Sequence, residues 1–262
     1  MQEITERHSS LTRIPICGTN SGMAIPLEKR NSRLPTRLSW TVAGAFVGAL
    51  WARLHHGAGT SIHSWHDFVL SREHAGFPLG ILISIVLLVL FSLYWEVAAK
   101  DVADTKTQES RASRGIHLTL VTAAQLLLLF PIPGLRARFL PNATALTLIG
   151  LVIEAAFLLL AVWARQLLGR NWSGAVAIKV DQALIRSGPY NFVRHPIYSG
   201  MLGAYLGIAI ISGEVHALLG LILACFAYWR KIRIEEQYLS TVFGSAYVDY
   251  QAHVSALIPG VL

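Results

Sequence analysis

The chain has 262 residues, of which 53% are hydrophobic and only 14% are charged. This balance is typical of an integral membrane protein and excludes an ordinary soluble domain. The formal charge of +7 does not indicate a nucleic-acid partner. The basic residues stand mostly beside apolar segments, where they set membrane topology and contact anionic lipid headgroups.

Residues 1–37 lack apolar periodicity and are predicted to form a mobile cytoplasmic tail. Six apolar segments follow, each near the length of roughly 20 helical residues that crosses a bilayer. They are 38–54, 78–99, 115–133, 143–164, 196–212 and 215–230. The last two are short, and only Gly213 and Glu214 separate them. The sequence therefore predicts an all-α fold: a polytopic integral membrane helical bundle of five to six transmembrane segments with a short C-terminal helical hairpin.

Lysine and arginine are unevenly divided between the two sides that six spans would define. One side collects the basic residues of the tail, of the loops around 100–114 and 165–194, and of the segment after 229. The opposite side has only Arg53, Arg72, Arg136 and Arg138. Because cytoplasmic loops retain positive charge, both termini and the polar motifs near the C-terminus are predicted to be cytoplasmic.

Two polar groups interrupt the apolar C-terminal part of the chain. Residues 187–200 read SGPYNFVRHPIYSG, and residues 230–236 read RKIRIEE. Proline is favoured in the first helical turn, so His195 is expected at the membrane-surface start of a helix that begins with Pro196. Folding the intervening apolar hairpin brings both groups to one membrane face. Titratable residues in such a place indicate a functional site.

Other polar and small residues have simpler interpretations. Five histidines between residues 55 and 74 favour a solvated or headgroup-facing loop over a metal site. Gly203 and Gly207 favour close helix packing over cofactor contact. Glu154, near the middle of an apolar segment, is expected to face the bundle interior, either in a structural hydrogen bond or lining a cavity.

The turn from Arg194 to Gly200 reads Arg-His-Pro-x-Tyr-x-Gly, and Glu235-Glu236 follows it. Together they resemble the signature of the isoprenylcysteine carboxyl methyltransferases and the related phospholipid methyltransferases. The resemblance covers roughly residues 163–260. It implies a C-terminal methyltransferase-like catalytic region at 165–262 and S-adenosyl-L-methionine as the cofactor. The apolar segments upstream are expected to form N-terminal transmembrane helices over 38–164.

The same resemblance implies roles for individual residues. Arg194, His195 and Glu235 are implied as catalytic. Lys231 is implied to hold the substrate carboxylate, with Arg230 or Arg233 as substitutes, since the family pattern has an arginine at position 231. The cofactor is implied to contact Gln182, Ala183, Leu184, Ile185, Tyr190, His195, Pro196, Ile197, Tyr198, Glu235 and Glu236. Tyr190 and Tyr198 suit a sulfonium cation, which aromatic faces attract, and they suit interfacial anchors nearly as well.

We therefore expect a membrane-embedded methyltransferase that O-methylates the carboxylate of a prenylcysteine-like lipophilic acceptor. Its expected partners are this acceptor and membrane lipids, without nucleic acid or metal. One alternative is an N-methyltransferase of phospholipid amines. Another is a sterol-type reductase using NADPH, whose turn continues Asn-Tyr where this chain has Ile197-Tyr198. A third is a lipid-binding scaffold without activity.

Overall fold

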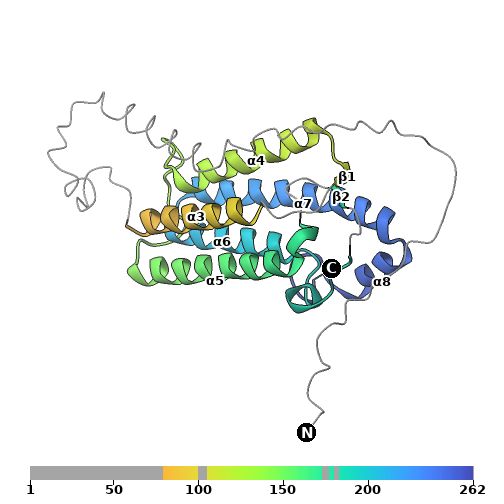
Figure 1. Ribbon diagram of the computed structural model, residues 1–262. Helices are drawn as coiled ribbons and strands as arrows, with labels where there is room; N and C mark the ends of the chain where they lie inside the picture. The colour runs from red at the N-terminus through yellow and green to blue at the C-terminus, as the bar shows by residue number, and fades with distance from the viewer. Residues whose placement is uncertain (1–78, 100–104, 173–176, 180–182, 262) are drawn as a thin grey trace, which may run out of the picture.

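The computed structural model describes residues 79–99, 105–172, 177–179 and 183–261. These residues form a bundle of long helices with a short helix and a small two-stranded ribbon at one end (Figure 1). The elements in chain order are α3 (Leu79–Ala98), β1 (Thr105–Gln108), α4 (Arg111–Leu129), α5 (Thr144–Leu168), the 3-10 turn η1 (Gly169–Asn171), β2 (Ala177–Lys179), the 3-10 turn η2 (Gly188–Asn191), α6 (Pro196–Ser212), α7 (Val215–Phe243) and α8 (Ser245–His253).

Every predicted apolar segment within the described residues is a helix, and the polytopic membrane bundle is confirmed. α3, α4, α5 and α7 are each long and apolar enough to cross a bilayer, and α6 is a shorter apolar helix of 17 residues. The expected span at 38–54 and the tail at 1–37 lie outside the described residues. The division of the chain at residue 165 stays a prediction.

The hairpin between α6 and α7 turns at Gly213 and Glu214 as predicted, but its second helix is longer than the expected 215–230. α7 has 29 residues and continues through the second polar motif. No glycine or proline interrupts it after Gly220. Gly244, with φ of 53°, ends it in a backbone conformation that suits glycine. The polar residues of the motif are therefore held on a rigid helix.

Glycines bring α5 and α6 close together. A Cβ atom on Gly207 would stand 2.5 Å from the backbone oxygen of Gly150, and one on Gly203 would stand 2.2 Å from the ring of Phe157. Both distances are shorter than a van der Waals contact, so a larger residue does not fit. The predicted packing role of Gly203 and Gly207 is confirmed. Small residues at such contacts let membrane helices pack without a hydrophobic driving force.

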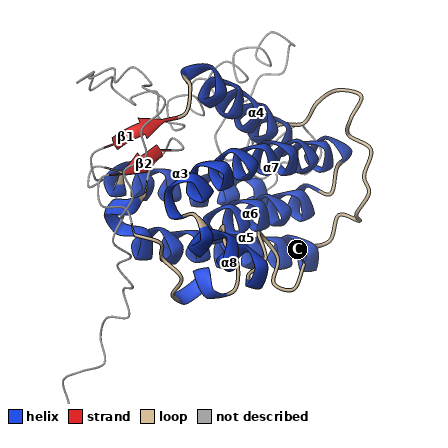
Figure 2. Cartoon of the chain, turned by 90° about the vertical axis from the view of Figure 1, so that its right-hand side faces the viewer, coloured by secondary structure: helices blue, strands red, loops and turns tan. Residues whose placement is uncertain are grey.

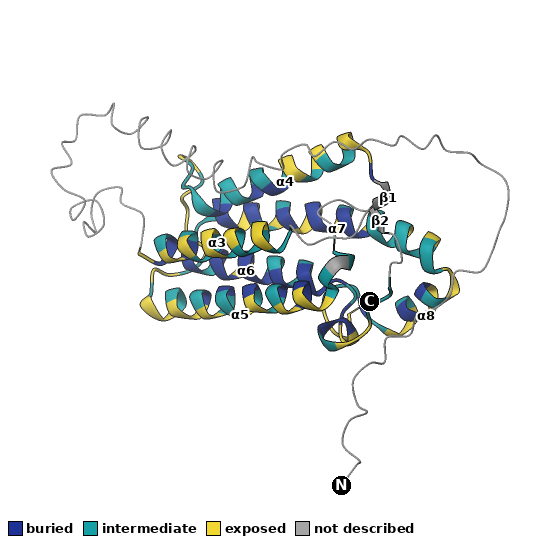
Figure 3. Cartoon of the chain, viewed as in Figure 1, coloured by how far each residue is buried: buried dark blue, intermediate teal, exposed yellow. Residues whose placement is uncertain are grey.

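Small side chains fill the contact between α4 and α7, while many large apolar residues are exposed. Exposed and buried positions alternate along the helices (Figure 3). Ala124, Ala217 and Ala224 are buried at the α4–α7 contact, and a Cβ on Gly220 would stand 2.8 Å from the carbonyl oxygen of Ala124. The exposed apolar residues include Leu90, Val152, Leu159, Ile222 and Trp229. This arrangement leaves the apolar surface of the bundle for lipid, as membrane helices require.

Glu154 is fully buried in α5. Its Oε2 atom accepts a hydrogen bond of 2.6 Å from the hydroxyl of Ser84 on α3. The bond connects two membrane helices at a depth where a carboxyl group facing lipid would be costly. It supports the structural role, one of the two alternatives that the sequence left open for Glu154.

One end of the bundle gathers the segments that carry the polar motifs (Figures 1 and 2). The starts of α4 and α6, the end of α7, the helix α8 and the strands β1 and β2 all lie there. β1 pairs antiparallel with β2, placing Thr105 opposite Lys179 and Gln108 opposite Ala177. This ribbon fastens the segment that precedes α4 to the segment that follows α5. These two strands have only four and three residues, and no sequence pattern predicts them.

The glycine contact predicts that Gly207→Val lowers the stability of the folded protein. The added side chain has no space against the backbone of Gly150, so we expect a loss of about 1–3 kcal/mol in unfolding free energy. Thermal unfolding in detergent measures it. The matched control is Gly115→Ala on α4, because a Cβ there meets nothing within 4 Å. Equal melting temperatures for the two variants would contradict this packing.

Candidate functional site

The first polar motif makes the 3-10 turn η2 and then starts α6. Gly188 at the turn has φ of 60°, which favours glycine. His195 is the N-cap of α6 and a proline takes the first helical position, as the sequence predicts. The amides of Arg194 and His195 donate to the carbonyls of Ser255 and Ala256, at 2.8 and 3.0 Å. The C-terminal segment thereby holds the start of α6 in place.

Arg194 joins three parts of the chain. Its Nη2 and Nε atoms lie 2.8 and 2.9 Å from Oε1 of Glu236 on α7. Its Nη1 atom donates to the carbonyls of Gln251, at 3.1 Å, and of Val254. The side chains of Arg194 and Glu236 are only 11% and 13% exposed. The pair therefore fixes the first motif, α7 and the C-terminal segment against one another.

His195 and Tyr198 connect the two motifs. Nε2 of His195 lies 3.2 Å from Oε1 of Glu236, and its ring stacks on Tyr198 with centroids 5.6 Å apart and an interplanar angle of 11°. The hydroxyl of Tyr198 donates to Oε2 of Glu235 at 2.7 Å. The Glu235 side chain is 32% exposed. The structure thus brings Arg194, His195, Tyr198 and both glutamates together, with Glu235 as the carboxylate that solvent or a ligand reaches.

Tyrosines continue from this network into the bundle. Tyr198 contacts Tyr228 of α7 with ring centroids 5.3 Å apart, and Tyr228 contacts Tyr205 of α6 at 6.4 Å. The Tyr205 hydroxyl accepts a hydrogen bond of 2.9 Å from the amide of Gln125 on α4. The site therefore adjoins a line of aromatic rings with polar atoms between α4, α6 and α7.

Tyr190, the other expected aromatic contact of the cofactor, is buried. Its hydroxyl donates to the carbonyl of Ala164 at 3.4 Å, and its own carbonyl accepts from the hydroxyl of Tyr250. Burial raises the pKa of Tyr190 well above its ordinary value and that of Tyr250 to about 12. Both phenols are therefore neutral at physiological pH and fix the turn that precedes α6.

The segment expected to wrap the cofactor lies beside the first motif. The amide of Ala183 donates to Oδ1 of Asn171 at 3.3 Å. Leu184 and Ile185 are partly exposed, and Ile185 packs with Tyr190 and Ile197. Gln182 lies outside the described residues. Pro196 and Ile197 are buried at the start of α6, so they pack inside the protein beside Tyr198 and do not face solvent.

The three basic residues considered for the substrate differ in their surroundings. Lys231 is 4% exposed and donates to Oε1 of Glu109. Arg230 donates to the hydroxyl of Ser113 at 3.0 Å. Arg233 lies over the ring of Trp229 at 6.0 Å. Glu109 was not among the predicted site residues, because it lies 122 positions before Lys231 and no sequence pattern joins the two segments.

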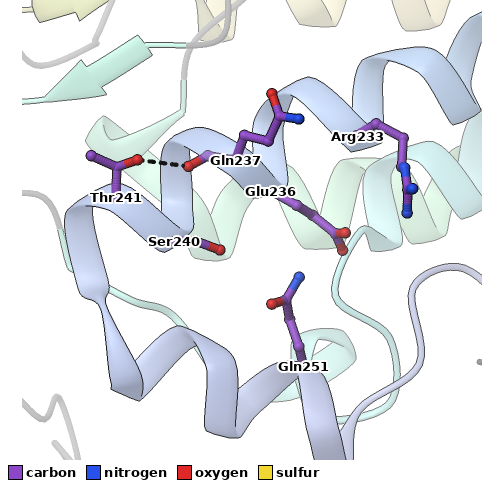
Figure 4. Close-up of a pocket in the computed structure, with 6 residues that line it drawn as sticks. All are labelled: Arg233, Glu236, Gln237, Ser240, Thr241 and Gln251. Atoms are coloured by element: carbon purple, nitrogen blue, oxygen red, sulfur yellow. Dashed lines mark hydrogen bonds between the residues drawn. The ribbon is translucent and has the colours of Figure 1, made fainter.

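A polar pocket of about 480 Å³ opens between the end of α7 and α8 (Figure 4). It is lined by Arg233, Glu236, Gln237, Ser240, Thr241 and Gln251. Arg233, Glu236 and Gln251 place charged and amide groups around it (Figure 4). The pocket reaches the buried network through Glu236, and it offers hydrogen-bonding groups on the solvent side of the site.

Comparison with known proteins confirms the resemblance to this methyltransferase superfamily. The family model described as phospholipid methyltransferase matches residues 145–246. That range contains the first motif, α6 and all of α7, so both motifs and the helices that position them lie within it.

Individual relatives are isoprenylcysteine methyltransferases. The protein-S-isoprenylcysteine O-methyltransferase of Saccharomyces cerevisiae is 31% identical over 35% of this chain and 39% of its own length. The corresponding B protein of Arabidopsis thaliana is 27% identical over 49% of this chain and 64% of its own length. A solved structure of the eukaryotic intramembrane Ras methyltransferase ICMT has a TM-score of 0.42 at 24% identity, covering 58% of this chain and 54% of that one. The chain thus matches less than two thirds of the length of these relatives.

The buried Arg194–Glu236 pair yields a stability prediction. Arg194→Gln leaves the Glu236 carboxylate buried without its cation, so we expect a loss of about 3–5 kcal/mol in unfolding free energy. Thermal or denaturant unfolding in detergent measures it. Asp249→Asn is the matched control, because it removes the exposed pair with Arg186 and is expected to cost less than about 1 kcal/mol. Similar losses for both variants would disprove the special role of the buried pair.

Proposed function

We propose that this chain is a membrane methyltransferase that uses S-adenosyl-L-methionine and O-methylates the carboxylate of a lipophilic, prenylcysteine-like acceptor. The observation that carries the proposal is the direct contact between the Arg194-His195 turn and the Glu235-Glu236 pair at one end of a membrane bundle. The region that matches the phospholipid methyltransferase model contains both motifs. The names of the relatives support the acceptor class.

The residues present fit this cofactor. Glu235 is a partly exposed carboxylate that can accept hydrogen bonds from hydroxyl or ammonium groups. Tyr198 offers an aromatic ring held by stacking on His195, and such rings attract cations. Leu184 and Ile185 add partly exposed apolar surface. When bound, the cofactor supplies an electrophilic methyl group on a sulfonium.

The protein's own residues act by positioning. An acceptor carboxylate is already ionised at neutral pH and needs no strong general base, so orientation and exclusion of water account for the catalysis. His195 contacts Glu236 and holds the ring of Tyr198, which suits positioning more than proton transfer. The buried Arg194–Glu236 pair holds the two motifs against each other.

We infer that the site faces the cytoplasm. Among the described residues, Arg114, Arg186, Arg194, Arg230, Lys231 and Arg233 belong to the segments that gather at this end, while Arg136 and Arg138 follow the opposite end of α4. Basic residues are retained on the cytoplasmic side of membrane proteins. A water-soluble cofactor then enters from the cytoplasm, and a lipophilic acceptor arrives from the bilayer.

Methylation of a lipid amine is the second candidate. Glu109 already neutralises Lys231, the cation expected to hold an acceptor carboxylate. With that pair intact, the charge near the site favours a neutral or cationic headgroup over an anionic one. An amine acceptor must also lose a proton, which a carboxylate such as Glu235 can take.

Cofactor binding tests the proposal directly. Calorimetry with S-adenosylhomocysteine and, separately, NADPH on the detergent-purified protein is expected to give saturable binding of the first alone. Glu235→Gln is expected to weaken that binding by about tenfold or more, because a hydrogen bond to a charged group contributes roughly 1.5–3 kcal/mol.

The matched control is Glu96→Gln, which removes an exposed carboxylate on α3 and leaves the affinity unchanged. Equal affinities for wild type and Glu235→Gln would remove the role of Glu235. Binding of NADPH alone would replace the methyltransferase proposal with a reductase, and binding of neither would support a scaffold.

A further inference from the structure

A buried ion pair lies next to the site and joins distant parts of the chain. Nζ of Lys231 on α7 donates to Oε1 of Glu109, and the two residues are 4% and 6% exposed. The hydroxyl of Ser113 donates to Oε2 of Glu109 at 3.0 Å, and Arg230 donates to the same hydroxyl at 3.0 Å. Glu109 is thus held on a cationic stretch of α7.

Lys231 lies on the face of α7 that packs against Tyr198. Tyr228 and Glu235 lie about one helical turn before and after Lys231, on the same face of α7. Tyr198 contacts Tyr228 through its ring at 5.3 Å and Glu235 through its hydroxyl at 2.7 Å. Lys231 therefore lies on the face of α7 that contacts Tyr198, the aromatic residue proposed to attract the sulfonium.

The burial of Lys231 constrains what can replace Glu109. An ammonium removed from water is strongly disfavoured without an anion next to it. Another carboxylate can take the place of Glu109 while keeping Lys231 paired, whereas a neutral or cationic group cannot. Glu109 follows β1 and precedes the N-cap residue Ser110, so it lies outside the helical hydrogen-bond ladder of α4.

We propose that Glu109 is a specificity-determining residue: an internal carboxylate that occupies the anion position at Lys231 and gives way only to the carboxylate of an acceptor. This inference rests on the proposed function and adds the residue that selects the charge of the acceptor. Exchange of one carboxylate for another leaves the net charge around Lys231 unchanged. A lipid amine cannot replace Glu109 in this way, because it carries no negative charge to pair with Lys231.

The exchange also predicts how product leaves. When the acceptor carboxylate becomes a methyl ester, its oxygen forms the new bond to the methyl carbon. The carbon–sulfur bond of the sulfonium breaks, its electron pair stays on sulfur, and no proton moves. The ester is neutral and no longer compensates Lys231. Glu109 then returns to Lys231, which displaces the ester.

Binding of acid and ester to Glu109→Gln tests this exchange without turnover. The probes are an S-farnesylcysteine derivative with a free carboxylate and its methyl ester, titrated by calorimetry in the presence of S-adenosylhomocysteine. In the variant the competing carboxylate is gone, so the preference for acid over ester is expected to rise at least about fivefold, in the range of typical coupling between sites. An unchanged or smaller preference would overturn the proposal.

A double variant covers the case in which Glu109→Gln does not fold. Glu109→Gln with Lys231→Met removes both charges together, a change that buried ion pairs often tolerate. It is expected to bind S-adenosylhomocysteine like wild type and to bind acid and ester about equally. Retention of the wild-type preference for the acid would mean that Lys231 and Glu109 do not read the acceptor. Glu96→Gln is again the exposed control.

The outcomes separate this inference from the function on which it rests. If the wild-type protein binds S-adenosylhomocysteine and methylates the acid but the acid-to-ester preference does not move, only the role of Glu109 fails. Methylation of a lipid amine in place of the acid also overturns the exchange. If the wild-type protein does not bind S-adenosylhomocysteine, the methyltransferase proposal fails and the inference falls with it.

Discussion

The buried contact between Arg194 and Glu236 is the interaction on which the rest of this end of the protein depends. One guanidinium binds a carboxylate on α7 and two carbonyls of the C-terminal segment. The fork of an arginine can make these contacts together, whereas the single ammonium of lysine cannot match the same geometry. Removing either charge would leave the other buried, so the start of α6 and the end of α7 are committed to one arrangement.

In this arrangement Glu236 is bound to Arg194, whereas Glu235 is not part of that pair. Consecutive residues on a helix point in different directions, which explains how Glu236 is buried against Arg194 and Glu235 reaches Tyr198. Glu236 is therefore structural, while the more exposed Glu235 is the glutamate for which a ligand-binding role is proposed. The line of tyrosines toward Gln125 extends the polar environment from this point into the bundle.

The sequence was informative wherever a signal is local. Apolar length predicted the described membrane helices, proline predicted the start of α6 at Pro196, and glycine spacing predicted the contact made by Gly207. The proximity of the two motifs followed from the hairpin between them. Glu109 was missed because a single acidic residue before a helix has many ordinary explanations. Its meaning depends on Lys231, which only the folded chain brings near, and the β1–β2 ribbon likewise joins segments without a local pattern.

No hydrocarbon chain can pass between α5 and α6 at the level of Gly150 and Gly207, because even a single Cβ atom on either glycine would lie 2.5–2.6 Å from the backbone oxygen of the other. The close contact also makes this pair resist separation, so the two helices behave as one wall. The small-residue contact of Gly220 with Ala124 makes a second wall from α4 and α7. Under the proposed function, a lipid acceptor that approaches Tyr198 between the described helices is therefore expected to use the seam between these walls rather than pass through either of them. The glycines thereby restrict where a hydrocarbon chain can pass between the described helices, in addition to setting their packing.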